Sequence, residues 1–422
     1  MNERFENSCF RPADILLPRD CDMTRWSVVA CDQYTSQPEY WERVAEFVGN
    51  APSTLKLVLP ESCLEGPDVE SDIMEINTTM SRYLRQNGFV TLPDSLIYVE
   101  RRLDDGTIRR GIVGMVDLEQ YDYEPGSPAL IRATEGTVLS RIPPRVAVRK
   151  NAPIELPHVM LLCDDRKGAV ILPLAEQTDK MEQVYDFELM ERGGHITGWK
   201  LGEAQMEQLA AALEELADPA AFRAKYGVGE DVSVMLYAVG DGNHSLATAK
   251  SCYEELKAQN PDEDLSMHPA RFALVELENI HDEAQVFEPI HRVIVKCDPK
   301  ALLAALEKEA CAEGGFEVKW YIGKESGTVS LDKAKSQLAV GVLQGFLDEY
   351  LKTNEGEIDY IHDDDALIAL ADQENAIGFL LPAMEKSQLF RGVIADGILP
   401  RKTFSMGHSR EKRYYLEGRK IK

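Results

Sequence analysis

Short helix and strand signals alternate along the whole chain, and this alternation limits the possible folds more than any other feature. The stretch LIYVERRLDDGTIRRGIVGMVDL, which begins at Leu96, places two β-rich runs on either side of a D-D-G turn, a pattern typical of a β-hairpin. YDFELMERGGHITGWKL predicts a second hairpin that turns at Gly193 and Gly194. AQMEQLAAALEEL consists of strong helix formers. We therefore predict a mixed α/β (α+β) protein with two lobes, in which largely antiparallel or mixed sheets carry flanking helices.

A length of 422 residues is more than one domain usually needs. The polar segment from Asp218 to Glu230 contains Pro and Gly and is a candidate boundary. We predict an N-terminal α+β domain over residues 1–225, with an Arg-rich segment, and a C-terminal α+β domain over residues 226–422. Within the first domain, HVMLLCDD and GAVILPLA are expected to form a strand pair.

The net charge of −26 describes a strongly acidic protein. Such a surface repels nucleic acid, because Lys and Arg supply most of the affinity for phosphates, so we expect no nucleic-acid partner. No apolar run reaches the ~18 residues of a membrane-spanning helix, and the N-terminal stretch lacks the pattern of a secretory signal. The eight cysteines form no C-x-x-C pair, which gives a structural zinc site no support. We expect a cytoplasmic protein without a membrane partner; the sequence leaves its oligomeric state open.

Two basic segments stand out from the acidic remainder. Residues 129–150 contain five Lys or Arg and one acid, and residues 401–422 contain eight Lys or Arg and two acids. They indicate either one concentrated anion site or ion pairing between segments. In the first segment, Arg132 and Arg141 are the candidate anion ligands, because arginine binds oxyanions in a bidentate way. Pro143 and Pro144 interrupt the i, i+4 arginine spacing there, which predicts a loop or an extended run.

The stretch MLYAVGDGNHSLATAKSCYEEL reads as an apolar strand, a polar turn and a helix. Glycine lets the backbone approach a ligand, and the N–H groups at a helix start favour anions, so we predict that Gly242, Asn243 and Ser245 contact a phosphate. Asp241 and His244 are candidates for proton transfer. The alternative is that Asn243 or Ser245 only caps the helix and His244 is a buried core residue.

Three further clusters supply candidates. In VVACDQYTSQPEYW, Asp32 follows an apolar strand and is a candidate general base, whereas Cys31 is a candidate nucleophile only if its pKa is depressed. In PIHRV, His291 is the candidate ligand, with a satisfied core histidine as the alternative. Arg401 and Lys402, in LPRKTFSMGHS, form either a phosphate clamp or a surface tail.

The acidic run HDDD, residues 362–365, has two readings. Its carboxylates are of the kind that binds Mg²⁺, but such a run more often forms the acidic first turn of a helix. We therefore assign no metal ligand to the protein itself.

The motifs also resemble a known family. VGDGNHSLATAK resembles the D-G-H-H-R-x-x-A-type signature of a large bacterial domain-of-unknown-function family, number one thousand and fifteen in the common series. GIVGMVDLEQY resembles its hairpin, IRATEGTVLSRIPPRVAVRKN its H-E-R-T-like segment, FEPIHRVI its P-x-H-R element and LPRKTFSM its closing P-K-S-T-like element. The resemblance covers essentially the full chain and implies fold and ancestry more than chemistry.

The same turn is more distantly similar to the phosphate-binding turn of the ParB, sulfiredoxin and free-serine-kinase superfamily. That resemblance implies a nucleotide site, with ATP or ADP and Mg²⁺, in which an acidic residue acts as base on a substrate hydroxyl. Asp241 and His244 match the turn, whereas Asn243 replaces its first histidine and Ser245 replaces its arginine.

Two functions follow as hypotheses. In the first, the protein is a small-molecule kinase or phosphotransferase that acts on a hydroxylated amino or hydroxy acid, with Asp32, Asp241 or His244 as the base. In the second, it binds a small phosphorylated molecule or nucleotide as a sensor without turnover. The sequence does not decide between them.

Overall fold

The structure, a computed structural model, describes residues 3–64, 66–137, 140, 142–311 and 314–422, and the chain divides into two compact units. Unit 1 comprises Met1–Ala133, Thr137–Gln285 and His408–Lys422, and unit 2 comprises Thr134–Gly136 and Val286–Gly407. The boundary that we expected after residue 225 therefore differs from the observed one, at Gln285. The reason is that strand β12 (Tyr237–Asp241), beyond the expected boundary, pairs with strands on both sides inside unit 1.

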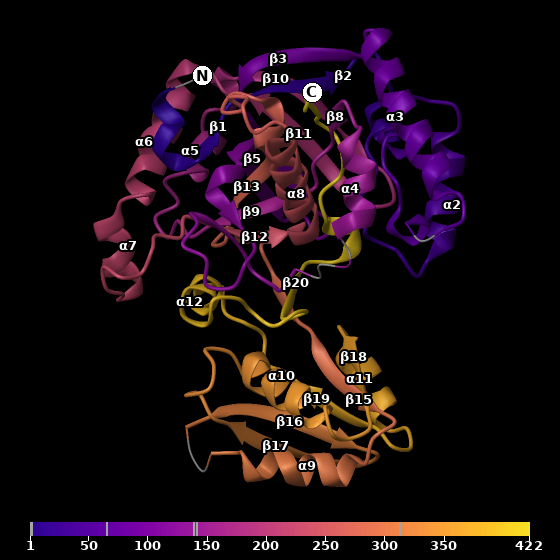
Figure 1. Cartoon of the computed structure of the whole chain (residues 1–422), viewed down its shortest axis with the longest axis vertical. Helices are drawn as coiled ribbons and strands as arrows, with labels where there is room; N and C mark the ends of the chain where they lie inside the picture. The colour runs from indigo at the N-terminus through magenta and orange to yellow at the C-terminus, as the bar shows by residue number, and fades with distance from the viewer. Residues whose placement is uncertain (1–2, 65, 138–139, 141, 312–313) are drawn as a thin grey trace. The chain divides into compact units, whose positions relative to one another are not determined.

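Unit 1 is built on a ten-stranded mixed sheet (Figure 1), in the order β10-β11-β4-β5-β13-β9-β12-β7-β6, with β1 paired to β5. Its other strands are β10 (Glu182–Leu189), β11 (Gly194–Lys200), β4 (Ile97–Arg102), β5 (Ile108–Asp117), β13 (Phe272–Asn279), β9 (Met160–Cys163), β7 (Ile131–Ala133), β6 (Tyr121–Asp122) and β1 (Phe10–Arg11). Pairing is antiparallel from β10 to β13 and between β9 and β12, and parallel at β13–β9, β12–β7 and β7–β6. Both predicted hairpins are present, and the mixed α+β class is confirmed.

Helices and two small ribbons cover this sheet. The helices of unit 1 are α1 (Met23–Trp26), α2 (Pro38–Val48), α3 (Val69–Arg85), α4 (Ile142–Lys150), α5 (Leu172–Ala175), α6 (Glu203–Leu216), α7 (Pro219–Tyr226) and α8 (Asn243–Gln259). The ribbons pair β2 (Ala13–Pro18) with β3 (Phe89–Ser95), and β8 (Ile154–Glu155) with β21 (Arg419–Lys420). The final strand β21 thus joins the C-terminus to the body of unit 1.

Strand β13 shows how the sheet separates two cores. Successive side chains of a strand point to opposite faces, so Val275 and Leu277 pack in one cluster while Leu274 packs in the other. Glu276 and Glu278 share the face of Leu274 and are almost fully buried. Two buried carboxylates on a core face require cationic partners. Arg413, in the C-terminal segment, pairs with Glu276 at 2.7 Å, and Arg109 pairs with Glu278 at 3.3 Å.

Unit 2 has a smaller antiparallel sheet in the order β17-β16-β19-β15-β18, and a separate β14–β20 pair. Its strands are β14 (Phe287–Pro289), β15 (His291–Val295), β16 (Phe316–Ile322), β17 (Glu325–Leu331), β18 (Glu357–Ile361), β19 (Ile377–Leu380) and β20 (Phe404–Met406). Its helices are α9 (Pro299–Lys308), α10 (Ala339–Tyr350), α11 (Asp364–Ala371) and α12 (Lys386–Asp396). Helices α10 and α11 pack on the sheet.

Three local predictions were wrong. GAVILPLA forms no strand and instead ends in α5. Pro143 and Pro144 do not prevent a helix, because they occupy the first turn of α4, where proline is tolerated. The apolar run before Cys31 is not a strand of a sheet; its Val29 forms a single bridge with Tyr414.

Among the described residues, no helix is both long enough and apolar enough to cross a membrane.

Candidate functional site

The turn between β12 and α8 brings a helix start and a carboxylate together. Gly242 has a left-handed backbone with φ 84°, and a Cβ there would lie 3.0 Å from the Cα of Val159, so the position requires glycine. Helix α8 begins directly afterwards at Asn243 and has no side-chain cap at Gly242. Asn243 and Ser245 lie inside the first turn, so the capping alternative does not describe this helix. The start of a helix carries the positive end of the helix dipole, which favours an anion there.

Asp241, at the end of β12, faces a lysine from the C-terminal segment. The Nζ of Lys412 lies 3.8 Å from Oδ1 of Asp241, which is the length of an ion pair and too long for a good hydrogen bond. The other carboxylate oxygen, Oδ2, is buried and has no hydrogen-bond partner in the described part of the chain. The pair is therefore loosely held and keeps a free acceptor beside the start of α8.

Asp32 lies close to the same lysine. Its Oδ1 accepts a hydrogen bond of 3.1 Å from Nε2 of Gln33, and its Oδ2 lies 3.9 Å from Nε2 of His158. Burial alone would raise the pKa of Asp32, but His158, Gln33 and Lys412 outweigh burial and hold that pKa below its ordinary value. Asp32 is therefore ionised at neutral pH, as a proton acceptor must be.

A buried tyrosine connects His158 with Cys31. The hydroxyl of Tyr415 lies 2.9 Å from Nδ1 of His158 and 3.0 Å from Sγ of Cys31, and it accepts a 3.2 Å bond from the backbone N–H of Cys31. Burial raises the pKa of the Cys31 thiol to about 12, so the nucleophile role considered for Cys31 is contradicted. The contact with Tyr415 thus holds the His158 ring through Nδ1, and the other ring nitrogen, Nε2, faces Asp32.

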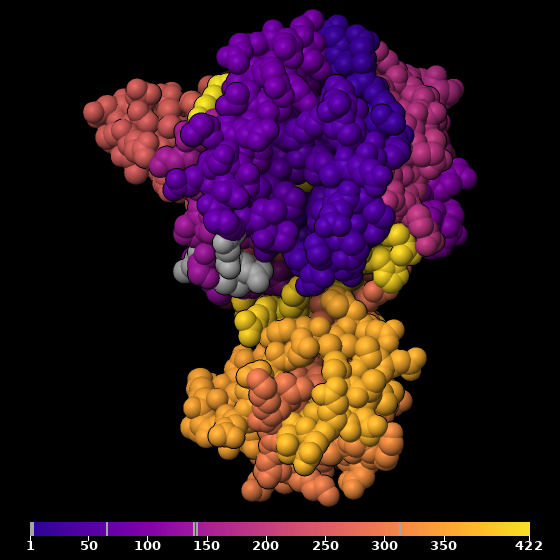
Figure 2. Space-filling model, turned by 90° about the vertical axis from the view of Figure 1, so that its right-hand side faces the viewer, coloured from indigo at the N-terminus to yellow at the C-terminus, as the bar shows by residue number. Residues whose placement is uncertain are grey.

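Two buried arginines fix the segment that carries Lys412. Nη1 of Arg101 donates to the carbonyls of Lys412 (2.7 Å) and Glu411 (3.0 Å), and Nη2 donates to that of Arg410 (2.6 Å). Nη1 of Arg109 also donates to the carbonyl of Glu411, at 2.6 Å. Lys412 is consequently presented from a rigid backbone, and Figure 2 shows atoms of the C-terminal segment, in yellow, inside a hollow of the face formed by the N-terminal segments.

The structure therefore places Asp241, at the start of α8, 3.8 Å from Lys412, and it places Lys412 near enough to Asp32 to lower the pKa of that carboxyl. His244 lies in the first turn of α8, and its carbonyl accepts a bond of 2.7 Å from Thr248. Sequence reasoning missed Lys412 and His158. The second basic segment, residues 401–422, was the only signal that pointed towards the lysine.

The first basic segment contributes differently from what we expected. Arg132 donates to the carbonyls of Ala129 (2.8 Å) and Ser233 (2.9 Å), and burial lowers its pKa. Its described contacts hold two loops together, and its role as a ligand contact stays a prediction. Arg141 lies outside the described residues. Arg145 forms a 2.7 Å ion pair with Glu61, whose backbone N–H donates to the carbonyl of Cys31.

His291, in unit 2, is a satisfied core histidine. Its Nδ1 accepts a 3.1 Å bond from the backbone N–H of Leu381, and its Nε2 lies 2.8 Å from Oδ1 of Asp364. Both ring nitrogens are occupied and the side chain is buried, so the ligand role predicted for His291 would require one of these partners to move. The core alternative therefore describes this residue.

Arg401 and Lys402 also belong to unit 2. Nε of Arg401 donates to the hydroxyl of Tyr360 at 2.9 Å, and the backbone N–H of Lys402 donates to Glu135 at 3.1 Å. The two hydroxyl groups that follow Lys402 donate to nearby carbonyls: that of Thr403 to Pro400 and that of Ser405 to Gly407. The clamp formed by Arg401 and Lys402 stays a prediction.

The acidic run before α11 has a structural explanation. Asp363 caps the helix by accepting the backbone N–H of Ala366 at 2.9 Å, and Asp364 pairs with His291. Within the described ranges, no three His, Cys, Asp or Glu side chains are grouped to hold a metal ion.

Comparison with known proteins identifies the family. The model of the family described as "Protein of unknown function (DUF1015)" matches residues 12–397, so this α+β chain belongs to that family, as its motifs predicted. No curated protein matches the chain in sequence.

Similar solved structures include free serine kinase in complex with AMP, with 12% identity, 73% of this chain and 90% of that chain covered, and a TM-score of 0.35. SbnI with a C-terminal truncation, from Staphylococcus aureus, has 10% identity, coverages of 72% and 85%, and a TM-score of 0.35. A conserved hypothetical protein from Pyrococcus furiosus has 12% identity, coverages of 72% and 90%, and a TM-score of 0.34. A mutant of free serine kinase in complex with ADP has a TM-score of 0.35 as well. At such values the likeness carries no argument about function.

Proposed function

We propose that unit 1 binds a nucleoside triphosphate and transfers its terminal phosphoryl group to the hydroxyl of a small amino or hydroxy acid. The observation that carries this proposal is the position of Lys412, which lies 3.8 Å from Asp241 at the start of α8 and near enough to Asp32 to lower its pKa. The turn motif, which resembles that of a nucleotide-binding superfamily, supports the same reading.

The phosphate-binding part consists of the α8 start and Lys412. Gly242 offers backbone without a side chain, and the positive end of the α8 helix dipole favours negative charge. Lys412 adds a full positive charge that is 9% exposed, and low exposure strengthens its interaction with a phosphate. Phosphoryl transfer depends mainly on positioning and charge neutralisation, which this arrangement supplies.

Asp32 is the proposed base. It is ionised and half-exposed, and it accepts the proton of the substrate hydroxyl as that oxygen bonds to the terminal phosphorus. The bond from phosphorus to the bridging oxygen breaks, and the nucleoside diphosphate leaves with the electron pair. His158, which Tyr415 orients, faces Asp32 and stabilises its negative charge before the proton arrives.

Mg²⁺ would accompany the nucleotide, and one feature of unit 1 fits a hard cation. Oδ2 of Asp241 is a buried carboxylate oxygen without a hydrogen-bond partner in the described part of the chain, and Mg²⁺ prefers such oxygens together with phosphates and water. When bound, the ion would neutralise phosphate charge next to two aspartates.

The test is a phosphoryl-transfer assay on the full chain. ATP with Mg²⁺ is offered with a panel of amino and hydroxy acids, and phosphorylated product and ADP are measured. We expect Asp32→Asn to reduce product formation about 100-fold or more, which is the scale of a general base. Asp20→Asn, an exposed position without such a role, is the control and should retain full activity. Equal product from Asp32→Asn and wild type would refute the base assignment.

A second function, nucleotide sensing without turnover, is favoured by Ser245. This position carries arginine in the turn that the motif resembles, and serine removes a charged group that would contact phosphate. The sensor hypothesis predicts thermal stabilisation by ATP or ADP with no product from any acceptor. Ligand at 100 times its dissociation constant would add about 2.7 kcal/mol to the unfolding free energy.

A further inference from the structure

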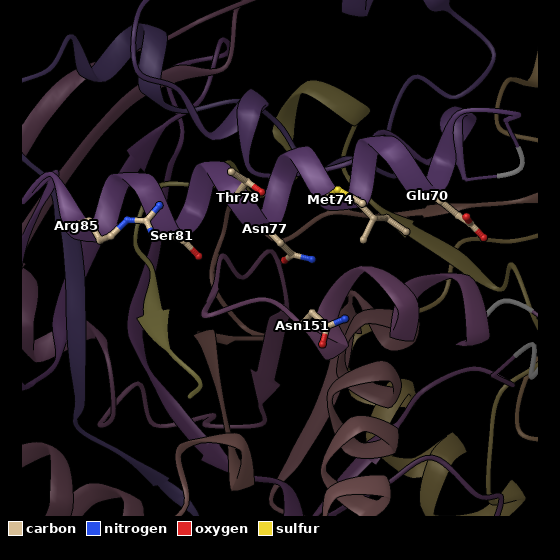
Figure 3. A pocket seen from close by; sticks show the side chains of 8 residues that line it. Glu70, Met74, Asn77, Thr78, Ser81, Arg85 and Asn151 are labelled. Carbon is tan, nitrogen blue, oxygen red and sulfur yellow. The ribbon is translucent and has the colours of Figure 1, made fainter.

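A groove on unit 1, away from the residues discussed so far, runs along helix α3. It has a volume of about 550 Å³, within the range of ligand sites. Its lining forms one stripe of α3 and one residue after α4: Glu70, Ile73, Met74, Asn77, Thr78, Ser81, Arg85 and Asn151. Figure 3 shows Asn77 pointing from α3 towards the side of the groove that carries Asn151. The groove goes beyond the proposed function, since none of these residues belongs to the catalytic cluster.

The polar side chains of this stripe are unused by the fold. Within the described part of the chain, none of the six polar lining side chains has a hydrogen bond or ion pair with another residue. Oδ1 of Asn77 is buried and unpaired, which is costly unless a ligand supplies a donor. The stripe therefore has the character of a recognition surface.

The arrangement of groups indicates the ligand chemistry. Side-chain carboxamides carry one acceptor and two donors, as Asn77 and Asn151 do, and this set matches the N–H and C=O groups of an extended peptide backbone. Ile73 and the exposed Met74 offer an adaptable apolar contact next to Glu70. Glu70 at one end is complementary to a basic side chain, and Arg85 at the other end to an acidic one. A helix partner fits less well, because it would need an apolar stripe and satisfies its own backbone.

The length of the groove is consistent with such a peptide. Glu70 and Arg85 are fifteen positions apart on α3, which corresponds to about 22 Å along the helix axis. An extended chain covers that distance in about seven residues. We propose that this groove binds an extended segment of a partner protein, about seven residues long, with a basic and an apolar residue near one end and an acidic residue near the other.

The experiment uses the full chain and a positional-scanning library of fluorescent heptapeptides, read by polarisation. We expect enrichment of Lys or Arg near one end and of Asp or Glu near the other. Asn77→Ala should weaken the selected peptide about five-fold, because one hydrogen bond to the backbone is lost. Glu75→Lys, on α3 but outside the groove, should leave binding unchanged.

A charge exchange makes the test specific. In the double variant Glu70→Lys and Arg85→Glu, both exposed positions, the preference of the library should reverse so that acidic and basic ends change places. Circular dichroism confirms that the variant is folded. No selection from the library, or selection that these two substitutions leave unchanged, would overturn the proposal. Binding of a compact helical peptide with the same charges, but not of the extended one, would also overturn it.

Discussion

Two aspartate–histidine clusters lie at opposite ends of strand β9, and they are built in opposite ways. After the strand, Oδ1 of Asp164 lies 2.6 Å from Nε2 of His281, and Oδ2 accepts the hydroxyl of Tyr226 at 2.6 Å and lies 2.9 Å from Nζ of Lys225. Burial would raise the pKa of Asp164, but these three partners hold it well below its ordinary value. Both carboxylate oxygens of Asp164 have close partners. Two of these partners, Lys225 and Tyr226, lie in α7, so this cluster joins α7 to the sheet.

Before the strand, the ion pairs are longer than a hydrogen bond. Asp32 is 3.9 Å from His158, Lys412 is 3.8 Å from Asp241, and one oxygen of Asp241 has no described hydrogen-bond partner. The same residue types at hydrogen-bond length stabilise the fold, whereas a longer spacing leaves their charge available to a ligand. Saturation of the hydrogen bonds, and not residue type, distinguishes the two clusters.

The strongest test of this comparison is Asp164→Asn. The substitution removes a buried charge and leaves Lys225 and His281 without their partner, so we expect a loss of about 3–5 kcal/mol in unfolding free energy. Urea denaturation measures it, and Asp262→Asn in an exposed loop is the control. A loss below about 1 kcal/mol would mean that the short contacts of Asp164 contribute little to the free energy of unfolding.

Substitutions in the cluster before β9 should lower activity and have little effect on the free energy of unfolding. His158→Gln retains a polar group beside Asp32 but removes the imidazole ring that faces it, so product formation should fall about 100-fold. The midpoint of urea unfolding should change less than in Asp164→Asn, since the contact with Tyr415 is lost but no close ion pair is. An unfolding loss like that of Asp164→Asn, with activity intact, would assign His158 to the fold.

The pH dependence of the unfolding free energy should differ between the wild type and Asp164→Asn. Asp164 has a folded pKa below its unfolded value, so its contribution is complete above about pH 4 and is lost as pH falls towards the folded pKa. Wild type should therefore lose up to about 1.4 kcal/mol per pH unit more than Asp164→Asn below pH 4. Parallel urea titrations between pH 5 and pH 2 measure this difference, and parallel curves would contradict it.

The smallest expected effect on stability belongs to Asp241→Asn. A carboxylate paired only at 3.8 Å gains little from its lysine, and its removal should change the unfolding free energy by no more than about 0.5 kcal/mol. The same variant should lose Mg²⁺-dependent tightening of nucleotide binding, measured by calorimetry. A large loss of stability would show that Asp241 is a structural residue.

Much of the fold could be predicted from the sequence because its signals are local. The D-D-G hairpin, helix α6 and the turn at Gly242 each depend on residues within one short stretch. The loop or extended run predicted from Pro143 and Pro144 was wrong, because the effect of proline depends on whether it begins a helix or interrupts one. The domain boundary failed for a different reason: strand order decides it, and strand order depends on pairing between distant segments.

The site was predictable in part. Asp32 and Asp241 stand next to recognisable turns, but Lys412 carries no local signal that distinguishes it from other basic residues of the tail. Its position depends on Arg101, about three hundred residues earlier in the chain, which binds the carbonyls of the segment. Such long-range contacts have no signature in one sequence.

The most direct test of the central claim, that the Lys412 cluster is the ligand site, is a calorimetric titration of the full chain with ADP and Mg²⁺. Lys412→Met is compared with Lys420→Met, an exposed lysine in the same C-terminal segment. A charge-assisted contact to phosphate predicts at least a ten-fold loss of affinity for Lys412→Met and no more than about a two-fold change for Lys420→Met. Equal affinities of the two variants and the wild type would contradict the claim.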